Sequence, residues 1–204
     1  MHHDQSAAET RTVIVTGAPG SGKSSVSRGL AARLPRAARV SADDVHAMIV
    51  SGGVWPLGHP RAEAARQVDL CHRQIGAVTT AFAADGFDTV IDCVLPDAAH
   101  LEQLLRRLPQ ATTSLVVLAP GEAVSRARNE SRAREDRFDF DDHVALDASM
   151  REGFGGRGWW LDTAGLGLDT TIQLIADGVL DGELGRLSME SPRSIATARG
   201  SIDV

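Results

Sequence analysis

The stretch GAPGSGKSS, residues 17–25, matches the pattern G-x-x-x-x-G-K-[ST] in full. A short β-branched run at 12–16 precedes it, and a helical pattern follows it. A loop between a strand and a helix in this way turns its backbone N–H groups toward phosphate oxygens. A glycine-rich turn with an incidental lysine would match the pattern by chance in about 1% of chains of this length. The stretch therefore predicts a P-loop that binds nucleotide phosphates.

Each residue type in this loop has a chemical role. Glycines let the backbone curl tightly enough for its N–H groups to converge on phosphate oxygens. The helix that follows adds the partial positive charge of its N-terminus. We expect Lys23 to reach the β- and γ-phosphates and Ser24 to bind Mg²⁺ through its hydroxyl. The residues expected to hold the nucleotide are Gly17, Ala18, Pro19, Gly20, Ser21, Gly22, Lys23, Ser24 and Ser25.

Lys23 is the only lysine in the chain, although lysine and arginine together number 21. Arginine suffices on solvated faces, where charge and reach are all that matter. Inside a ring of backbone N–H groups the compact ammonium of lysine fits, whereas a planar guanidinium is bulkier and needs partners for its donors. The sequence therefore has lysine at the position where its geometry is needed.

The chain of 204 residues is the right length for one globular domain. We expect that domain at 11–183, a flexible N-terminus at 1–10 and a mobile tail at 184–204, where periodicity is lost. The first residues lack the apolar segment of a signal peptide, and no apolar run is long enough to span a bilayer, which favours a cytoplasmic protein. Cys71 and Cys93 are typical of buried thiols in such a protein.

Short apolar runs alternate with helical periodicities along the chain. Strands are predicted at 12–16, 38–41, 89–92, 114–118 and 159–162. Helices are predicted at 24–34, 43–50, 61–85, 99–108, 122–134, 141–154 and 170–180. This alternation predicts a three-layer α/β sandwich with a central parallel sheet. With the phosphate loop, it predicts a P-loop NTPase of the nucleoside-kinase type with a short lid.

Two adjacent carboxylates, Asp43 and Asp44, follow the second predicted strand. A carboxylate at that end of a strand can face the γ-phosphate and accept the proton of an acceptor hydroxyl. Both residues also precede an apolar helical pattern, where an aspartate caps the helix N-terminus. Capping and catalysis are compatible for two adjacent residues, so either could be the base. We favour Asp43 as the general base and place Asp44 in the acceptor site.

Further charged residues fit the same chemistry. Asp92 ends a predicted strand, where an acid suits a contact to magnesium or to a water molecule; a strand-end turn residue is the alternative. Five arginines crowd 126–137, and some of them suit a solvated helix face paired with nearby acids. Arg128 and Arg132 are spaced i, i+4 and share one face. A lid arginine stabilises the charge on a transferred phosphoryl group, and Arg132 is our first choice for it.

The sequence resembles a known group, the small P-loop kinases that include chloramphenicol phosphotransferase and the polynucleotide 5′-hydroxyl kinases. The segments that carry the resemblance are GAPGSGKSS at 17–25, VSADDVHAMI at 40–49 and RNESR at 128–132. The resemblance spans 12–180. The segment IDCVLP around Asp92 is similar to a strand of this group that often bears two adjacent acids, but Cys93 replaces one of them here.

By position, the resemblance implies that Asp43 is the general base. It implies that Lys23 and Arg132 stabilise the transferred phosphoryl group. It also implies that Arg128 lies near the adenine. A polynucleotide kinase of this group has an arginine three residues after the catalytic aspartate, whereas this chain has His46. The net charge of −6 also provides no electrostatic attraction for a nucleic-acid strand.

We therefore expect a kinase that transfers the γ-phosphate of ATP to a hydroxyl of a small, largely uncharged molecule, either an antibiotic or a metabolite. ATP and Mg²⁺ are the expected cofactors, and neither a membrane nor a nucleic acid is an expected partner. Candidate acceptor-site residues are Asp44, His46, Trp55 and His59, although Trp55 also suits a packing role. The alternatives are a nucleoside or polynucleotide 5′-hydroxyl kinase and a nucleotide-binding switch that hydrolyses ATP.

Overall fold

One five-stranded sheet organises the protein. The computed structural model describes residues 10–109, 111–134, 137, 140–180 and 182–187. Its strands are β1 (Arg11–Gly17), β2 (Ala37–Ser41), β3 (Asp88–Asp92), β4 (Thr112–Leu118) and β5 (Trp159–Leu161). They pair in the order β2-β3-β1-β4-β5, and every pairing is parallel. The parallel sheet predicted from the alternating pattern is thus confirmed.

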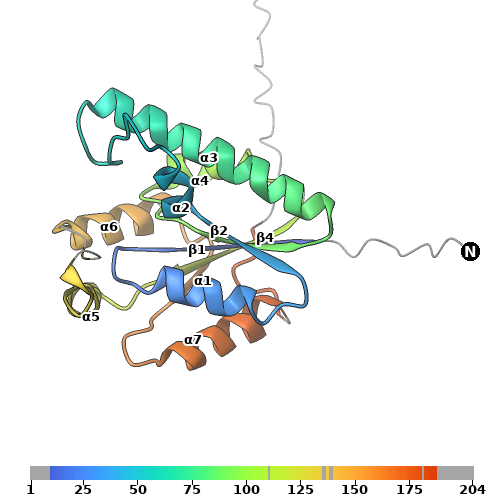
Figure 1. Ribbon diagram of the computed structural model, residues 1–204. Coiled ribbons are helices and arrows are strands. Elements are labelled where there is room, and N and C mark those ends of the chain that lie inside the picture. Colours follow the sequence, from blue (N-terminus) through green and yellow to red (C-terminus); the bar gives the residue numbers. More distant parts are fainter. Residues whose placement is uncertain (1–9, 110, 135–136, 138–139, 181, 188–204) are drawn as a thin grey trace, which may run out of the picture.

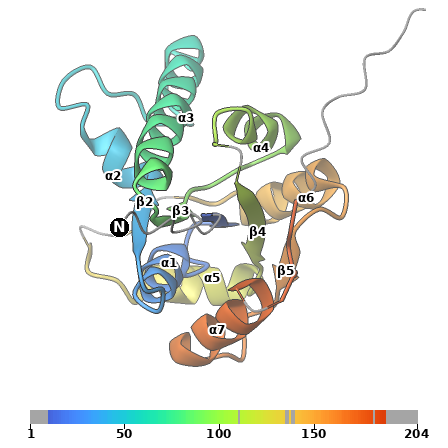
Figure 2. The same ribbon diagram turned by 90° about the vertical axis from the view of Figure 1, so that its right-hand side faces the viewer.

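Helices cover both faces of the sheet (Figures 1 and 2). Those of one face are α1 (Lys23–Ala31) and α7 (Leu168–Ile175). Those of the other face are α2 (Ala42–Ala47), α3 (Arg61–Ala84), α4 (Ala98–Leu105) and α6 (His143–Phe154). The remaining α-helix, α5 (Glu122–Glu130), lies near the carboxyl end of β1. The arrangement confirms the three layers. Within the described residues, no helix combines the length and the apolarity that crossing a membrane requires.

The core is divided by the alternation of side chains along each strand. Successive residues of a strand point to opposite faces of the sheet. One apolar cluster packs with α1 and α7 and contains Val13, Val15, Val90 and Val116. The other packs with α3, α4 and α6 and contains Ile14, Val40, Ile91, Leu115 and Val117. Because both faces are covered, the central residues of β1, β3 and β4 are consecutive apolar side chains, as is typical of parallel sheets.

Four predicted helices end three or four residues earlier than their sequence patterns indicated. Those predicted at 43–50 and 99–108 end at Ala47 and Leu105. The helix predicted at 24–34 ends at Ala31. The N–H groups of the next residues bond to carbonyls three residues earlier, and Pro35, which has no N–H, ends this hydrogen bonding. The helix predicted at 122–134 ends at Glu130. Helix ends are the least constrained part of a pattern, since a short final turn depends on tertiary contacts.

The chain after α7 returns to the sheet. The N–H of Leu187 donates to the carbonyl of Thr113 at 2.9 Å, and the N–H of Leu115 donates to the carbonyl of Gly185 at 2.8 Å. Leu187 is buried, and Arg186 forms a bridge with β4. The first residues of the segment predicted as a mobile tail therefore pack against β4. Residues 1–9 and 188–204 lie outside the described part of the chain.

This packing predicts a difference between two leucines of the same segment. Leu187→Ala should lower the free energy of unfolding by about 2 kcal/mol, because it removes a buried side chain. Leu184→Ala should change it by less than about 0.5 kcal/mol, because Leu184 is 49% exposed. Urea unfolding followed by circular dichroism measures both. Equal effects would contradict the packing of this segment.

Candidate active site

The loop between β1 and α1 has the geometry of an anion site. Gly22 precedes α1 in a left-handed conformation, with φ of 100°, and no described side chain caps the N-terminus of this helix. The first N–H groups of α1 are thus available to an anion. Ser21 Oγ is buried and has no hydrogen-bond partner among the described residues. Lys23 Nζ folds back over the loop and donates to the carbonyl of Ala18 at 3.1 Å. These features fit bound phosphates.

Helix α5 packs directly against this loop. Gly20 has a φ of +82°, and a Cβ added there would lie 2.2 Å from the carbonyl oxygen of Ser125. Only glycine permits this approach. Arg128 of α5 donates to the carbonyl of Ser21 at 3.1 Å and to the carbonyl of Thr163 at 2.9 Å. Arg128 therefore joins the phosphate loop to the loop that leads into α7.

Lys23 is at the centre of the charges that the sequence selected. Burial lowers the pKa of Lys23, while the negative charges of Asp92 and Asp43 oppose that shift and the positive charge of Arg132 adds to it. Such interactions are largely screened beyond about 10 Å in solution. The fold therefore gathers residues from α1, α2, the end of β3 and the segment after α5 around one ammonium group.

The two adjacent aspartates have different surroundings. Ser41 is the N-cap of α2, and its Oγ accepts from the N–H of Asp44 at 3.4 Å, so neither aspartate is the cap. The Asp44 carboxylate is 71% exposed and pairs with Arg39 at 3.1 Å. Asp43 acts electrostatically on Lys23 and on Cys71, whose pKa rises to about 11 mainly through burial. Asp43 is thus the aspartate whose charge is felt at the phosphate loop.

Asp92 is held by an arginine that the sequence analysis did not select. The Asp92 side chain is only 3% exposed, and its Oδ2 accepts from Arg39 at 2.7 Å. Within the described residues, no three His, Cys, Asp or Glu side chains form a metal cluster. Magnesium in kinases is held by few protein groups and by phosphate oxygens. The exposed hydroxyl of Ser24 and the carboxylate of Asp92 therefore fit the protein's share of such a site.

His143, the first residue of α6, also contacts the phosphate loop. Its Nε2 lies 3.1 Å from the carbonyl oxygen of Pro19. A carbonyl only accepts, so Nε2 carries the proton, and the buried Nδ1 has no partner among the described residues. Beside this contact is a cavity of about 290 Å³ between the carboxyl end of β4, α5 and α6. Nothing in the sequence pattern distinguished His143, because its partner is a backbone atom distant in the chain.

The predicted acceptor residues lie on α2 and on the loop that follows it. His46 is half-buried on α2, whereas Trp55 and His59 are exposed on the loop at 48–60. Figure 1 shows this loop at the same end of the sheet as the phosphate loop. The buried Gln67 of α3 fastens the loop, since its Oε1 accepts from the N–H of Val54 and its Nε2 donates to the carbonyl of Gly52, both at 2.8 Å.

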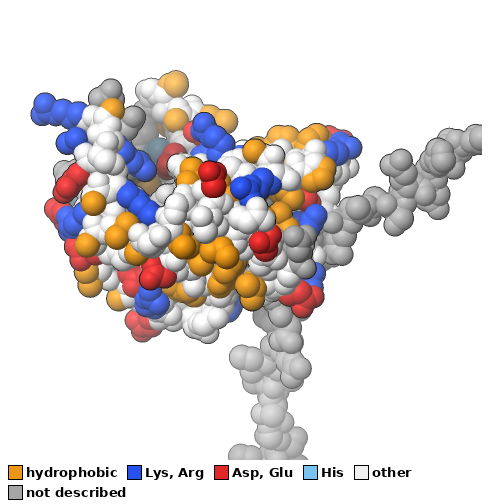
Figure 3. All heavy atoms as spheres, turned by 90° about the horizontal axis from the view of Figure 1, so that it is seen from below, with side chains coloured by type: hydrophobic (Ala, Val, Ile, Leu, Met, Phe, Trp, Pro, Cys, Tyr) orange, Lys and Arg blue, Asp and Glu red, His pale blue; other side chains and the backbone are white. Residues whose placement is uncertain are grey.

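The surface near the phosphate loop carries both basic and apolar side chains. Figure 3 shows lysine and arginine side chains gathered at the upper left of the molecule, beside a hollow and on the side where Figure 1 places α5. The loop at 48–60 instead exposes large hydrophobic side chains, namely Met48, Val50, Trp55 and Leu57. An arginine-rich helix, α5, and an apolar loop therefore lie at the phosphate-loop end of the sheet.

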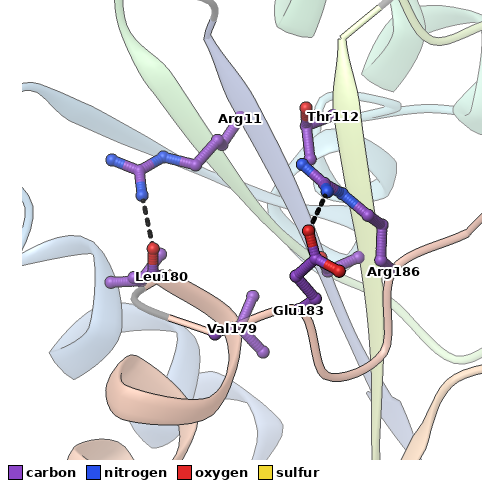
Figure 4. Close-up of a pocket in the computed structure, with 8 residues that line it drawn as sticks. Arg11, Thr112, Val179, Leu180, Glu183 and Arg186 are labelled. Atoms are coloured by element: carbon purple, nitrogen blue, oxygen red, sulfur yellow. Dashed lines mark hydrogen bonds and ion pairs between the residues drawn. The ribbon is translucent and has the colours of Figure 1, made fainter.

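A second cavity, of about 250 Å³, lies at the amino end of the sheet. Figure 4 shows Arg11 and Arg186 on opposite sides of it. Arg11 donates to the carbonyl of Leu180 at 3.0 Å, and Arg186 pairs with Glu183 at 2.7 Å. The Arg11 hydrogen bond joins the C-terminal segment to β1, whereas the Arg186 pair lies within that segment, so the partners of both guanidinium groups are structural.

The sheet order, the phosphate loop and the paired layers define a P-loop fold of the kinase type. A family model described as an AAA domain matches residues 13–152, which is more than half of the chain, and the chain belongs to this family. The resemblance to P-loop kinases noted in the sequence is thereby confirmed. No curated protein matches the chain.

Solved structures share the fold. An unliganded sugar kinase from Janibacter sp. HTCC2649 is 22% identical over 83% of this chain and 94% of its own, with a TM-score of 0.61. The Deinococcus radiodurans tunicamycin resistance protein is 18% identical over 88% and 99%, with a TM-score of 0.58. The Mycobacterium tuberculosis APS kinase CysC, in complex with AMPPNP and APS, is 19% identical over 85% and 99%, with a TM-score of 0.61. At these identities the likeness concerns the fold.

The position of Lys23 predicts that arginine cannot replace it. In Lys23→Arg the guanidinium would occupy the space between the loop carbonyl of Ala18 and the bound phosphates. ATP affinity should therefore fall at least about tenfold, or about 1.4 kcal/mol. Isothermal titration calorimetry measures this. Arg28→Lys, on the exposed side of the same helix, is the matched control and should bind ATP normally. Normal ATP binding by Lys23→Arg would refute the geometric argument.

Proposed function

We propose that the protein is a magnesium- and ATP-dependent kinase that phosphorylates a hydroxyl of a small molecule. The observation that carries this proposal is the uncapped N-terminus of α1 with Lys23 folded over the loop, where the charges of Asp43, Asp92 and Arg132 act on that ammonium. Phosphoryl transfer needs positioned charges more than covalent chemistry by the protein, and these groups supply both signs of charge. Family membership and the fold support a nucleotide-dependent phosphotransferase.

The nucleotide phosphates bind to the N–H groups of the loop and of the first turn of α1. Lys23 and Arg132 balance the negative charge of the phosphoryl group during transfer. Ser24 and Asp92 are the residues that would hold magnesium, which when bound would neutralise phosphate charge. Arg128, hydrogen-bonded to the carbonyls of Ser21 and Thr163, forms one wall of the space for the adenine of the nucleotide.

Asp43 accepts the proton of the acceptor hydroxyl. Both aspartates lie in the first turn of α2, and the electrostatic effect of Asp43 on Lys23 supports this assignment over Asp44. Asp44 is engaged by Arg39 and largely solvated. A carboxylate within reach of the acceptor hydroxyl can take its proton as the hydroxyl oxygen attacks phosphorus.

The loop after α2 favours an acceptor with an uncharged, partly apolar body. Residues 48–58 contain no charged side chain, and they expose four large hydrophobic ones. Concentrated apolar exposure of this kind is typical of a binding surface. Two proteins with this fold, a sugar kinase and a tunicamycin resistance protein, agree with a small hydroxylated acceptor, which for this chain is an antibiotic or a metabolite.

The other candidate functions have less support. A polynucleotide acceptor would call for a basic surface, whereas the chain carries a net charge of −6 and has His46 where such kinases carry arginine. A switch that only hydrolyses ATP does not account for an uncharged apolar loop beside the general base. ATP turnover separates these functions, because a kinase responds to its acceptor and a switch does not.

The two aspartates provide the test of the chemistry. A mass-spectrometric screen of hydroxylated compounds, sugars and antibiotics included, identifies an acceptor by its gain of a phosphoryl group. With that acceptor, Asp43→Asn should lower kcat at least about 100-fold, the usual contribution of a general base, while ATP affinity changes little. Asp44→Asn should lower kcat less than about fivefold, because the amide oxygen still accepts from Arg39. Full activity of Asp43→Asn would overturn the assignment.

Trp55 tests the acceptor side separately. Trp55→Ala should raise the KM for the acceptor about tenfold through lost apolar contact and leave the KM for ATP unchanged. Phe82→Ala is the control. Phe82 is also a partly exposed aromatic residue, but it lies near the C-terminus of α3, whereas the loop that contains Trp55 leads into the N-terminus of that helix. If Trp55 only packs the loop, both KM values stay constant and only thermal stability falls.

A further inference from the structure

Arg39 lies where its direction is set by the pleat of β2. Val40, the next residue, belongs to the apolar cluster under α3, so Arg39 points to the opposite face, toward α1. The Arg39 side chain is only 15% exposed. An arginine directed into a nearly closed space between a sheet and a helix needs partners for its donors.

The guanidinium has three partners from three different elements. Nε donates to Ser27 Oγ of α1 at 3.0 Å. One terminal nitrogen donates to the Asp44 carboxylate of α2 at 3.1 Å. The other donates to the Asp92 carboxylate at the end of β3 at 2.7 Å. The same group thus touches the helix that follows the phosphate loop, the helix that bears Asp43 and the strand that ends in Asp92.

Arginine is the side chain that can make this junction. Its planar fork presents five N–H donors in fixed directions, whereas lysine presents one compact ammonium. Asp92 is a buried carboxylate, and such a group requires a charged or hydrogen-bonding partner to replace the water it loses on folding. Because Oδ2 is engaged by Arg39, the rotation of the carboxylate is restricted, and its other oxygen has a defined direction.

We propose that Arg39 is a positioning residue for magnesium: it orients Asp92 toward the metal and holds α2 at a set distance from α1. This inference rests on the proposed function, because it assumes that a magnesium–nucleotide complex binds at the phosphate loop. Arg39 acts through Asp92 and touches neither phosphate nor acceptor. It also engages Asp44, which leaves Asp43 as the carboxylate of α2 that serves the transfer.

Magnesium-dependent binding distinguishes positioning from a purely structural role. ATP affinity is measured by calorimetry with Mg²⁺ and with a chelator, and the ratio of the two gives the gain due to the metal. Arg39→Lys keeps the positive charge and loses the fork. Its gain should be about tenfold smaller than in the unsubstituted protein, the usual effect of removing a partner of a metal ligand, while metal-free affinity should change little.

A double substitution tests whether Arg39 acts through Asp92. Asp92→Asn should reduce the gain by itself, and adding Arg39→Lys to it should cause no further loss. The matched control is Arg11→Lys, because Arg11 also pairs with an aspartate of β3, Asp88, but at the other end of the strand. Arg11→Lys should leave the gain unchanged.

Ser27→Ala covers the case in which Arg39→Lys does not fold. It removes the partner of Nε, together with a hydrogen bond within α1 from Ser27 Oγ to the carbonyl of Ser24, and should reduce the gain about threefold. Two results would overturn this inference and leave the proposed function intact. The first is an undiminished gain in Ser27→Ala and in any folded Arg39→Lys. The second is a loss of gain from Arg39→Lys that is equally large with and without Asp92→Asn. Failure of the unsubstituted protein to bind ATP would refute the proposed function and, with it, the positioning role.

Discussion

No side chain among the described residues caps the N-terminus of α1, and the rest of the site is arranged around this helix end. The carboxyl end of β1 and the left-handed Gly22 direct the first N–H groups of this helix to one point. Lys23 adds an ammonium at that point and is folded back onto the loop. Parallel strands bring their other carboxyl ends to the same edge, so a loop that binds anions at the end of β1 acquires neighbours from β2, β3 and β4.

Different positive groups serve different geometries at this edge. Lys23 is a compact charge inside a backbone ring. Arg128 and Arg39 are forks that hold separate elements together, the first joining the phosphate loop to the β5–α7 loop and the second joining α1, α2 and β3. Arg132 directly follows α5, and its charge acts on Lys23. A chain with a single lysine thus uses arginine wherever several acceptors lie in one plane, and lysine where there is room for one ammonium.

The predicted site is partly a matter of spacing along the chain and partly of contacts across it. The phosphate loop was legible because its nine residues carry all of its geometry locally. The choice between Asp43 and Asp44 was harder to predict from the sequence, because it depends on Ser41 as the cap of α2 and on Arg39 as the partner of Asp44. The contact of His143 could not be predicted from the sequence, since its partner is a backbone carbonyl of the phosphate loop, far away in the chain.

By itself the sequence determined the layered α/β architecture, the nucleotide-phosphate loop and the charged residues that could serve transfer, because apolar period and loop chemistry are local properties. Only the tertiary structure decided which charges meet. The pleat of β2 turns Arg39 toward α1, and the parallel register brings Ser41 beside Asp92, so that one guanidinium reaches a buried carboxylate of the next strand. Side-chain direction and strand neighbours are set by the packing of the whole sheet, which no stretch of nine residues contains.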